Sequence, residues 1–433
     1  MLGERLTFVY QKTMLYERWS RLARKRSTEP AVCEVVSGRR WSFAELARAA
    51  EGGPPDAGTL ACARGHSADF VVAVLRAWRA GAVLCPLEPE QPVPAFRVPP
   101  TPCCHLKITS ATTGPGRAVA FTAEQLAADA DNIVATMGLR PDWPNLGVIS
   151  MAHSYGFSNL VLPLLLHGIP LVLVPAPLPE MVRTAAENWP AITLAAVPAM
   201  WRAWHEACAI PRNVRLAISA GAPLSLALER AVFESGGLKI HNFYGSTECG
   251  GIAYDASAAP RTDDSCVGTS MQNVRLELNA DGCLRVLSRA VGQGYWPALD
   301  AALGDGCFQT SDLAEFRDGR IYLRGRLNDQ INVAGRKIAP ENIEEALRQH
   351  PAVAECLVFG APGSAAERGE IIVACVVRRE PVAAARLKQF LLDRLPAWQV
   401  PREWQFVETL NTSARGKISR TEWRRAFRSG PPV

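Results

Sequence analysis

The sequence of 433 residues is too long for one hydrophobic core of ordinary size, so it predicts two or three domains. Hydrophobic residues make up 48% of the chain and charged residues 21%, which is the composition of a globular protein. The net charge of +5 is spread without a dense basic block, and this argues against nucleic-acid binding.

Neither a signal peptide nor a membrane span is expected. Charges occur within the first five residues, and no apolar run precedes a small-residue cleavage site. The apolar stretch 160–177 is interrupted by Pro163, His167, Gly168 and Pro170. The cysteines contain no C-x-x-C pair, so they form neither a typical zinc motif nor a disulfide framework. A cytoplasmic location fits this pattern best.

The stretch from residue 59 to residue 87 predicts a βαβ unit. Two short apolar segments, TLACARG and AVLCPL, flank the helix-like SADFVVAVLRAWRAG. Ser67 is expected to cap the helix, and Gly81 to end it. One apolar face of the helix is expected to comprise Phe70, Val71, Val74, Leu75 and Trp78.

Residues 108–122, ITSATTGPGRAVAFT, are typical of a loop that binds an anion. Thr109, Ser110, Thr112 and Thr113 offer hydroxyl donors, and the nearby glycines let backbone amides approach closely. The loop lacks the Gly-Lys-[Ser/Thr] ending of a Walker A motif. An ordinary solvated turn remains the alternative at this point.

The remaining chain predicts a layered α/β body followed by a smaller α+β domain. Strand-like segments with short helices between them are LGVISMAH, IPLVLVP, ITLAAVP, VRLAISAGAP and LKIHNFYG, and they favour largely parallel sheets. After Gly325, helix-like PENIEEALRQH and RLKQFLLDRLP accompany strand-like ECLVFGAP and IIVACVVRRE. The predicted domains are residues 1–325 and 326–433.

Residues 242–251, NFYGSTECGG, place an aromatic ring, a hydroxyl and a carboxylate within five residues. These groups suit stacking on a base, binding a phosphate and holding Mg²⁺. QTSDLAEF, GRLNDQINVAGRKIAPENIEEAL and NTSARGKISR follow in that order. With the loop at residue 109, the whole series resembles the adenylate-forming superfamily of acyl-CoA synthetases, peptide-synthetase adenylation domains and luciferases. The loop departs from the family pattern at Ala111, Gly116, Arg117 and Ala118.

The resemblance implies an enzyme that uses ATP and Mg²⁺ to convert a carboxylic acid into an acyl-adenylate. It also implies transfer of the acyl group to a thiol, either of CoA or of a separate carrier protein. The implied nucleotide-binding residues are Thr109, Ser110, Thr112, Thr113, Gly114, Gly221, Ala222, Pro223, Tyr244, Gly245, Asp312 and Arg326. The implied catalytic residues are Arg117, Thr247, Glu248 and Lys417, with Glu248 as the Mg²⁺ ligand.

Further implied positions concern the acyl pocket and the movement between the two half-reactions. The acyl-pocket residues are His153, Tyr155, Gly156, Phe157, Gly250 and Gly251. His153 has a second interpretation, as a core histidine bonded to a backbone carbonyl. The resemblance implies a mobile C-terminal domain with its hinge at Asn328, and a thiol tunnel at Gly335 and Arg336. MAHSYGFSNL lacks the aspartate of amino-acid-activating members, so an aryl or aliphatic acid is favoured over an amino acid.

Other classes of function fit the sequence less well. The chain has no G-x-G-x-x-G for a Rossmann site and no G-x-S-x-G for a serine hydrolase. A non-catalytic relative that binds a nucleotide or an acyl group remains open, because the phosphate loop is altered at Ala111 and Arg117. Arg117 itself has two interpretations, as a cation for the leaving phosphates or as a side chain that points into solvent.

Overall fold

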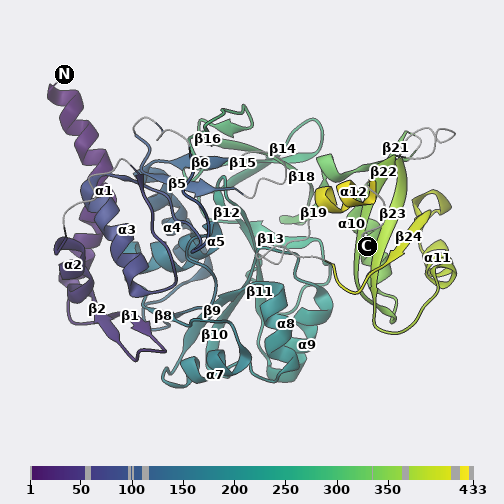
Figure 1. Cartoon of the computed structure of the whole chain (residues 1–433), viewed down its shortest axis with the longest axis horizontal. Coiled ribbons are helices and arrows are strands. Elements are labelled where there is room, and N and C mark those ends of the chain that lie inside the picture. The colour runs from purple at the N-terminus through teal and green to yellow at the C-terminus, as the bar shows by residue number, and fades with distance from the viewer. Residues whose placement is uncertain are drawn as a thin grey trace. The chain divides into compact units, whose positions relative to one another are not determined.

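The computed structural model describes residues 2–53, 60–95, 99, 102–109, 117–333, 335–362, 370–410 and 420–428 (Figure 1). The chain forms two compact units. The larger comprises Met1–Glu277, Arg285–Gln309 and Arg317–Ile321, and the smaller comprises Leu278–Leu284, Thr310–Phe316 and Tyr322–Val433. The boundary between residues 325 and 326 stays a prediction. None of the described helices is long and apolar enough to cross a membrane.

A mixed sheet forms the centre of the larger unit. Its strands follow the order β13-β12-β11-β10-β9-β7-β8-β1-β2. Their bounds in that order are Cys266–Ser270, Gly250–Tyr254, Ile240–Ser246, Val214–Ser219, Ile192–Ala196, Asn145–Gly147, Leu171–Leu173, Pro30–Glu34 and Arg40–Ser42. From β11 to β1 the neighbours pair in parallel, whereas β12, β13 and β2 pair antiparallel. All of β9 is buried, as expected for a strand covered on both faces.

Short helices connect these strands, as the sequence predicted. α4 (Ala123–Met137) packs on β12, and α9 (Leu226–Gly236) packs on β11. The helices α7 (Pro179–Glu187) and α8 (Pro198–Glu206) lie with α9 along the lower edge of Figure 1. A helical stretch made of α5 (Ser154–Gly156), η1 (Phe157–Val161) and α6 (Leu162–His167) joins β7 to β8. At the N-terminus, α1 (Leu2–Lys25) and α2 (Phe43–Glu51) pack on each other.

A second sheet of the larger unit contains the predicted βαβ unit. Its order is β16-β6-β5-β4-β3, with bounds Gly294–Trp296, Ala118–Phe121, His105–Ile108, Val83–Leu84 and Leu60–Ala61. The βαβ prediction is confirmed, because β3 and β4 pair in parallel and α3 (Ala68–Ala80) connects them with its predicted face buried. Gly81 ends the helix with a φ of 62°. Ser67 occupies the N-cap position of α3, as predicted, but its side chain makes no capping hydrogen bond.

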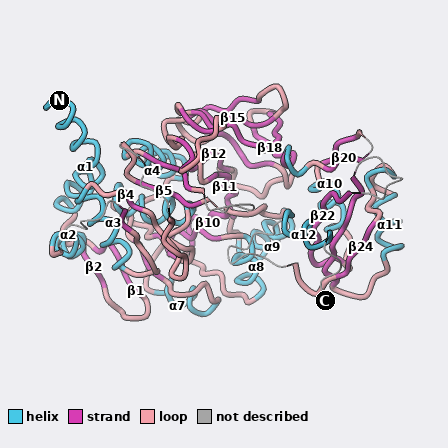
Figure 2. The backbone as a smooth tube through the Cα atoms, turned by 45° about the horizontal axis from the view of Figure 1, so that its top comes forward, coloured by secondary structure: helices cyan, strands magenta, loops and turns pink. Residues whose placement is uncertain are grey.

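The smaller unit contains a sheet of order β22-β23-β24, with bounds Val353–Pro362, Glu370–Arg378 and Glu403–Phe406. α10 (Pro340–Arg348) and α12 (Arg420–Arg428) pack on β22, and α11 (Ala384–Leu392) packs on α10 (Figure 2). Ile343, Val358 and Leu387 are buried in its core. The helices and strands predicted after Gly325 are therefore confirmed.

The other elements are short or are divided between the units. The smaller unit contains a hairpin of β20 (Ile331–Val333) and β21 (Arg336–Ile338). It also contains the short helices η2 (Leu327–Asp329) and η3 (Ala397–Gln399). The short strand β17 (Leu303–Gly304) belongs to the larger unit. The divided strands are β14 (Arg275–Leu278), β15 (Cys283–Leu287), β18 (Cys307–Arg317) and β19 (Arg320–Arg326).

None of the twelve cysteines, all of which are among the described residues, forms a disulfide. Most of them are buried, whereas Cys208, which follows α8, is exposed. Its φ of 51° lies in the left-handed region that few residues with side chains adopt.

Candidate active site

Three of the predicted site segments lie at the carboxyl ends of parallel strands. His153 follows β7, Gly221 follows β10, and Tyr244 lies near the end of β11. Because β7, β9, β10 and β11 pair in parallel as neighbours, their carboxyl ends share one edge of the sheet. Ligands of α/β sheets bind outside this edge. The fold thus brings together segments that are far apart in the sequence.

The loop of Gly221, Ala222 and Pro223 begins directly after β10. Ala220 donates its backbone N–H to the carbonyl of Ala196 at 3.2 Å, which joins the start of the loop to the end of β9. Gly221 has a φ of 86°, where a residue with a side chain would be strained. Gly221 and Pro223 are exposed, so the loop is accessible to a ligand.

Thr247 and Glu248 lie in the turn between β11 and β12. Across this hairpin Ser246 pairs with Gly250. A Cβ atom at Gly245 would lie only 2.6 Å from the carbonyl oxygen of Gly250, so the close approach of the two strands requires glycine. The turn leaves Thr247 and Glu248 partly exposed beside the carboxyl edge.

Thr109 and Arg117 close the base of the predicted phosphate loop. The backbone N–H and the hydroxyl of Thr109 both donate to the carbonyl oxygen of Arg117, at 2.8 and 2.9 Å. β5 and β6 continue from there as an antiparallel hairpin. The predicted residues Ser110, Thr112, Thr113 and Gly114 lie outside the described residues.

Arg117 is held by two side chains of one segment. Its guanidinium lies 3.5 Å from the ring centroid of Tyr295, and Nη2 lies 3.3 Å from Oδ2 of Asp300. The Tyr295 hydroxyl donates to Oε1 of Glu248 at 3.0 Å. The structure therefore brings Arg117 and Glu248 together through Tyr295, and Arg117 does not simply extend into solvent.

A buried ion pair lies behind Gly250 and Gly251. Lys107 and Asp129 are almost inaccessible, with Nζ and Oδ2 3.5 Å apart. Ser158 bridges them, because its hydroxyl accepts from Lys107 at 3.0 Å and donates to Asp129 at 2.6 Å. Asp129 also accepts the backbone N–H of Gly251 at 3.3 Å. The network joins β5, α4, η1 and β12.

The segment of His153, Tyr155, Gly156 and Phe157 is anchored by contacts on several sides. Burial raises the pKa of Tyr155, so its hydroxyl stays protonated and donates to the carbonyl of Ala196 at 3.4 Å. Phe157 is buried. A Cβ atom at Gly156 would overlap the backbone of the preceding turn.

His153 pairs with a carboxylate rather than a backbone carbonyl. Its Nε2 lies 2.9 Å from Oε1 of Glu88, and its side chain is 30% exposed. The interpretation of His153 as a core histidine bonded to a backbone carbonyl is therefore wrong. Glu88 also accepts the Ser150 hydroxyl at 2.6 Å, which fixes the carboxylate that faces the imidazole.

The smaller unit contains the other predicted residues. Asp312 accepts from Nε of Arg326 at 2.9 Å. Asn328 lies in η2. Gly335 donates its backbone N–H to the side-chain oxygen of Asn332 at 2.9 Å. The predicted catalytic residue Lys417 lies outside the described residues.

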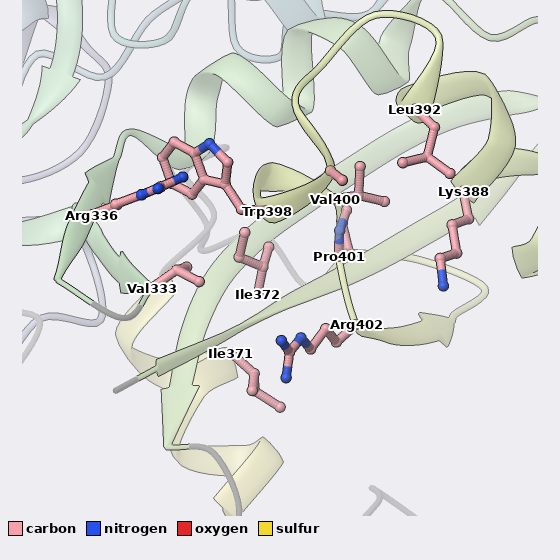
Figure 3. A pocket seen from close by; sticks show the side chains of 11 residues that line it. Val333, Arg336, Ile371, Ile372, Lys388, Leu392, Trp398, Val400, Pro401 and Arg402 are labelled. Carbon is pink, nitrogen blue, oxygen red and sulfur yellow. The ribbon is translucent and has the colours of Figure 1, made fainter. Parts of the chain in front are cut away.

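A pocket of about 500 Å³ lies within the smaller unit (Figure 3). Arg336, Lys388 and Arg402 contribute cationic side chains to its lining, and Trp398, Val333 and Ile372 contribute apolar surface. The Arg336 guanidinium lies 5.5 Å from the ring centroid of Trp398. The pocket therefore combines positive charge with an aromatic face.

Comparison with protein families identifies two matching segments. The model for AMP-binding enzymes matches residues 97–296, and the model for their C-terminal domain matches residues 342–417. The chain belongs to the AMP-binding enzymes. This AMP-binding enzyme is 29% identical over 347 residues to feruloyl-CoA synthase of an Amycolatopsis species, covering 75% of the chain and 70% of the relative. It is 27% identical over 370 residues to 2,3-dihydroxybenzoate-AMP ligase of Bacillus subtilis (strain 168), covering 79% and 68%.

Solved structures confirm the predicted fold class of this AMP-binding enzyme. ATP-bound MatB from Rhodopseudomonas palustris superposes with a TM-score of 0.83 at 20% identity, covering 95% of this chain and 99% of that one. The o-succinylbenzoate CoA synthetase of Bacillus subtilis, in complex with its acyl-adenylate intermediate, gives a TM-score of 0.82 at 21% identity, covering 95% and 98%. The shared fold has a large N-terminal and a small C-terminal domain.

Sequence reasoning did not identify Lys107, Asp129 or Tyr295 in this AMP-binding enzyme. A lysine inside the buried strand β5 was a usable signal, because lysines are rarely buried without a partner. Asp129 was a second usable signal, because it lies on the apolar face of α4. Tyr295 gave no comparable signal, since an aromatic residue in a short strand is ordinary.

Proposed function

We propose that this chain is an ATP-dependent carboxylic acid ligase. It forms an acyl- or aryl-adenylate with release of pyrophosphate and then transfers the acyl group to a thiol. The observation that carries the proposal is the contact series Arg117–Tyr295–Glu248, in which a cation and a carboxylate are held together beside the edge where ligands bind α/β sheets. The resemblance of Tyr244–Glu248 to the family motif supports the same assignment.

Charge development explains why the reaction needs both groups. Attack of a carboxylate on the α-phosphate shifts negative charge to the phosphoryl oxygens and to the leaving pyrophosphate. Fixed cations lower the free energy of that transition state. Arg117 would serve the leaving phosphates, and Thr247 would donate its hydroxyl to the α-phosphate. Lys417 would act at the attacking oxygen, as the resemblance implies.

Glu248 fits the role of a magnesium ligand. Mg²⁺ usually binds one or two carboxylates together with substrate phosphates and water. Within the described ranges, no group of three or more His, Cys, Asp or Glu side chains could hold a metal ion. A single oriented carboxylate such as Glu248 is compatible with binding of Mg²⁺ together with phosphates. When bound with ATP, Mg²⁺ would supply positive charge at the phosphates.

The buried charges favour an aryl or aliphatic acid over an amino acid. Asp129 is the carboxylate near Gly251, but Lys107 already neutralises it. An α-ammonium group would therefore lack a counter-charge there, and burying it would be costly. The named relatives support an aryl acid, since feruloyl-CoA synthase and 2,3-dihydroxybenzoate-AMP ligase are named for aryl substrates.

The pocket of the smaller unit supports CoA as the thiol acceptor. CoA carries several phosphate charges and an adenine ring, and the pocket offers Arg336, Lys388, Arg402 and Trp398. A separate carrier protein is the second candidate, because its pantetheine arm has the same thiol. Consumption of free CoA in the presence of the acid and ATP would separate the two acceptors.

Exchange of labelled pyrophosphate into ATP tests the proposed function. A panel of aryl, aliphatic and amino acids is assayed with the purified chain, and at least one aryl acid should support exchange. Glu248→Gln serves as the inactive control. ATP binding without exchange for any acid would favour the alternative of a non-catalytic relative.

A further inference from the structure

Glu248 needs a partner to hold its side chain in place. It lies in a turn and has several rotatable bonds, so its carboxylate would otherwise sample many orientations. The Tyr295 hydroxyl donates to its Oε1 at 3.0 Å. A carboxylate offers about four acceptor positions, and this bond uses one of them. The remaining positions are compatible with binding a cation.

Tyr295 is itself held rigidly. It is buried in β16, which lies beside β6, and it pairs there with Val119 (Figure 1). Just before it, Gly292 donates its backbone N–H to the carbonyl of Glu248 at 2.8 Å. Gln293 donates in the same way to Ala120 at 2.8 Å. The hydroxyl therefore belongs to a segment joined to both the Glu248 turn and the strand after the phosphate loop.

The aromatic ring of Tyr295, in contrast to its hydroxyl, contacts Arg117. The guanidinium lies 3.5 Å from the ring centroid, close enough for a strong interaction between the cation and the ring. Asp300, five positions along the chain, lies 3.3 Å from the same guanidinium.

We infer that Tyr295 is a positioning residue of the adenylation reaction, which orients Glu248 for Mg²⁺ and Arg117 for the leaving phosphates. This inference rests on the proposed function and deepens it. The hydroxyl acts through Glu248 and therefore matters when magnesium is bound. The ring acts through Arg117 and matters whether or not magnesium is present. The two roles are separable because they depend on different atoms of one side chain.

Binding of ATP to the full chain, measured by calorimetry with Mg²⁺ and again with a chelator, tests the inference. Tyr295→Phe removes only the hydroxyl, so it should raise the Kd for ATP about tenfold with Mg²⁺ and leave it nearly unchanged with the chelator. Tyr295→Leu also removes the ring and should weaken binding under both conditions. Tyr16→Phe is the matched control. Tyr16 lies on α1, and its hydroxyl also donates to a glutamate, Glu51, at 3.5 Å.

A double-mutant cycle provides the second measurement. Glu248→Gln should show the same magnesium-dependent loss, and adding Tyr295→Phe to it should cause little further change, because the hydroxyl acts through the carboxylate. Additive losses would overturn the inference. So would a Tyr295→Phe variant that binds ATP as the unaltered chain does, or one that loses affinity equally with and without Mg²⁺.

Failure of the proposed function is distinguishable from failure of this inference. An unaltered chain that binds no ATP would overturn both. An unaltered chain that binds ATP with Mg²⁺ and exchanges pyrophosphate, combined with an unaffected Tyr295→Phe, would overturn the inference alone.

Discussion

Arg420 and Asp329 form an ion pair in the smaller unit, with Nη1 and Oδ2 3.3 Å apart. Asp329 directly follows the predicted hinge residue Asn328, and Arg420 begins α12 shortly after the predicted catalytic Lys417. Arg420 also binds Glu341 at 2.7 Å and Glu344 at 2.8 Å. One guanidinium thus joins the chain beside the predicted hinge to the helix that follows the predicted catalytic lysine.

Replacement of Arg420 by alanine should destabilise the smaller unit. Glu344 is 5% exposed, and removal of Arg420 would leave its charge poorly compensated, which costs about 3 kcal/mol. Urea unfolding followed by tryptophan fluorescence measures the loss. Arg348→Ala is the control, because Arg348 binds the same carboxylate at 3.1 Å but is 48% exposed and should cost less than about 1 kcal/mol. Equal losses would contradict the assignment of Arg420 as the main partner.

Lys107→Met should be strongly destabilising, by about 3 to 5 kcal/mol, because Asp129 would remain buried without a counter-charge. The double variant Lys107→Met/Asp129→Leu should recover much of the loss, since both charges are then absent. The free energies of unfolding of the two variants, measured by chemical denaturation, test this expectation. A double variant less stable than Lys107→Met would show that the pair is not a self-contained unit.

Gly250 and Gly237 provide a matched pair of glycines with the same backbone conformation. Their φ values are 69° and 68°, but a Cβ at Gly250 would lie 1.9 Å from Oδ1 of Asp129, whereas none of the described atoms lies within 4 Å at Gly237. Gly237→Ala should cost about 1 to 2 kcal/mol, the strain of the left-handed conformation. Gly250→Ala should cost clearly more, as measured by unfolding in urea. Similar costs would mean that Asp129 moves aside easily.

His105 should make the stability of the larger unit depend on pH. Burial, with a smaller effect of the Lys107 charge, holds the pKa of His105 well below its ordinary value of 6.5. The unfolded chain takes up a proton below pH 6.5 and the folded chain does not, so stability falls as the pH falls from 6.5 toward the folded pKa. The slope should reach about 1.4 kcal/mol per pH unit.

Unfolding free energies of the unaltered chain and His105→Leu between pH 8 and pH 5 test this dependence. Neither ring nitrogen of His105 has a hydrogen-bond partner among the described residues, so leucine should be tolerated. The difference in unfolding free energy between the unaltered chain and His105→Leu should change only below about pH 6.5. A constant difference over the whole range would refute the assignment.

The sequence predicted local structure well because the controlling interactions are close in the chain. The helical period placed Phe70, Val74 and Trp78 on one face, and that face is buried in α3. Ser67 shows the limit of such reasoning, because its residue type favours a cap while its side-chain orientation decides whether one forms. Segment order also predicted the parallel strands that collect His153, Gly221 and Tyr244 at one edge.

The contacts that join these segments could not be predicted in the same way. Tyr295 contacts Glu248 because β16 pairs with β6, and nothing in the spacing of the two residues indicates that pairing. Lys107 on β5 and Asp129 on α4 meet only in the folded chain, so the sequence around either residue did not indicate its partner. Roles assigned by resemblance, such as those of Asp312 and Lys417, stay predictions.

The exposure of Cys208 gives the larger unit a natural attachment point for a fluorescent dye. The other cysteines are buried or half-buried, so a maleimide reagent added to the native protein should react first at the end of α8. Cys208→Asn supplies the unlabelled reference, because asparagine accepts the left-handed backbone at this position. The dye can then be attached to the unaltered sequence without first removing any thiol.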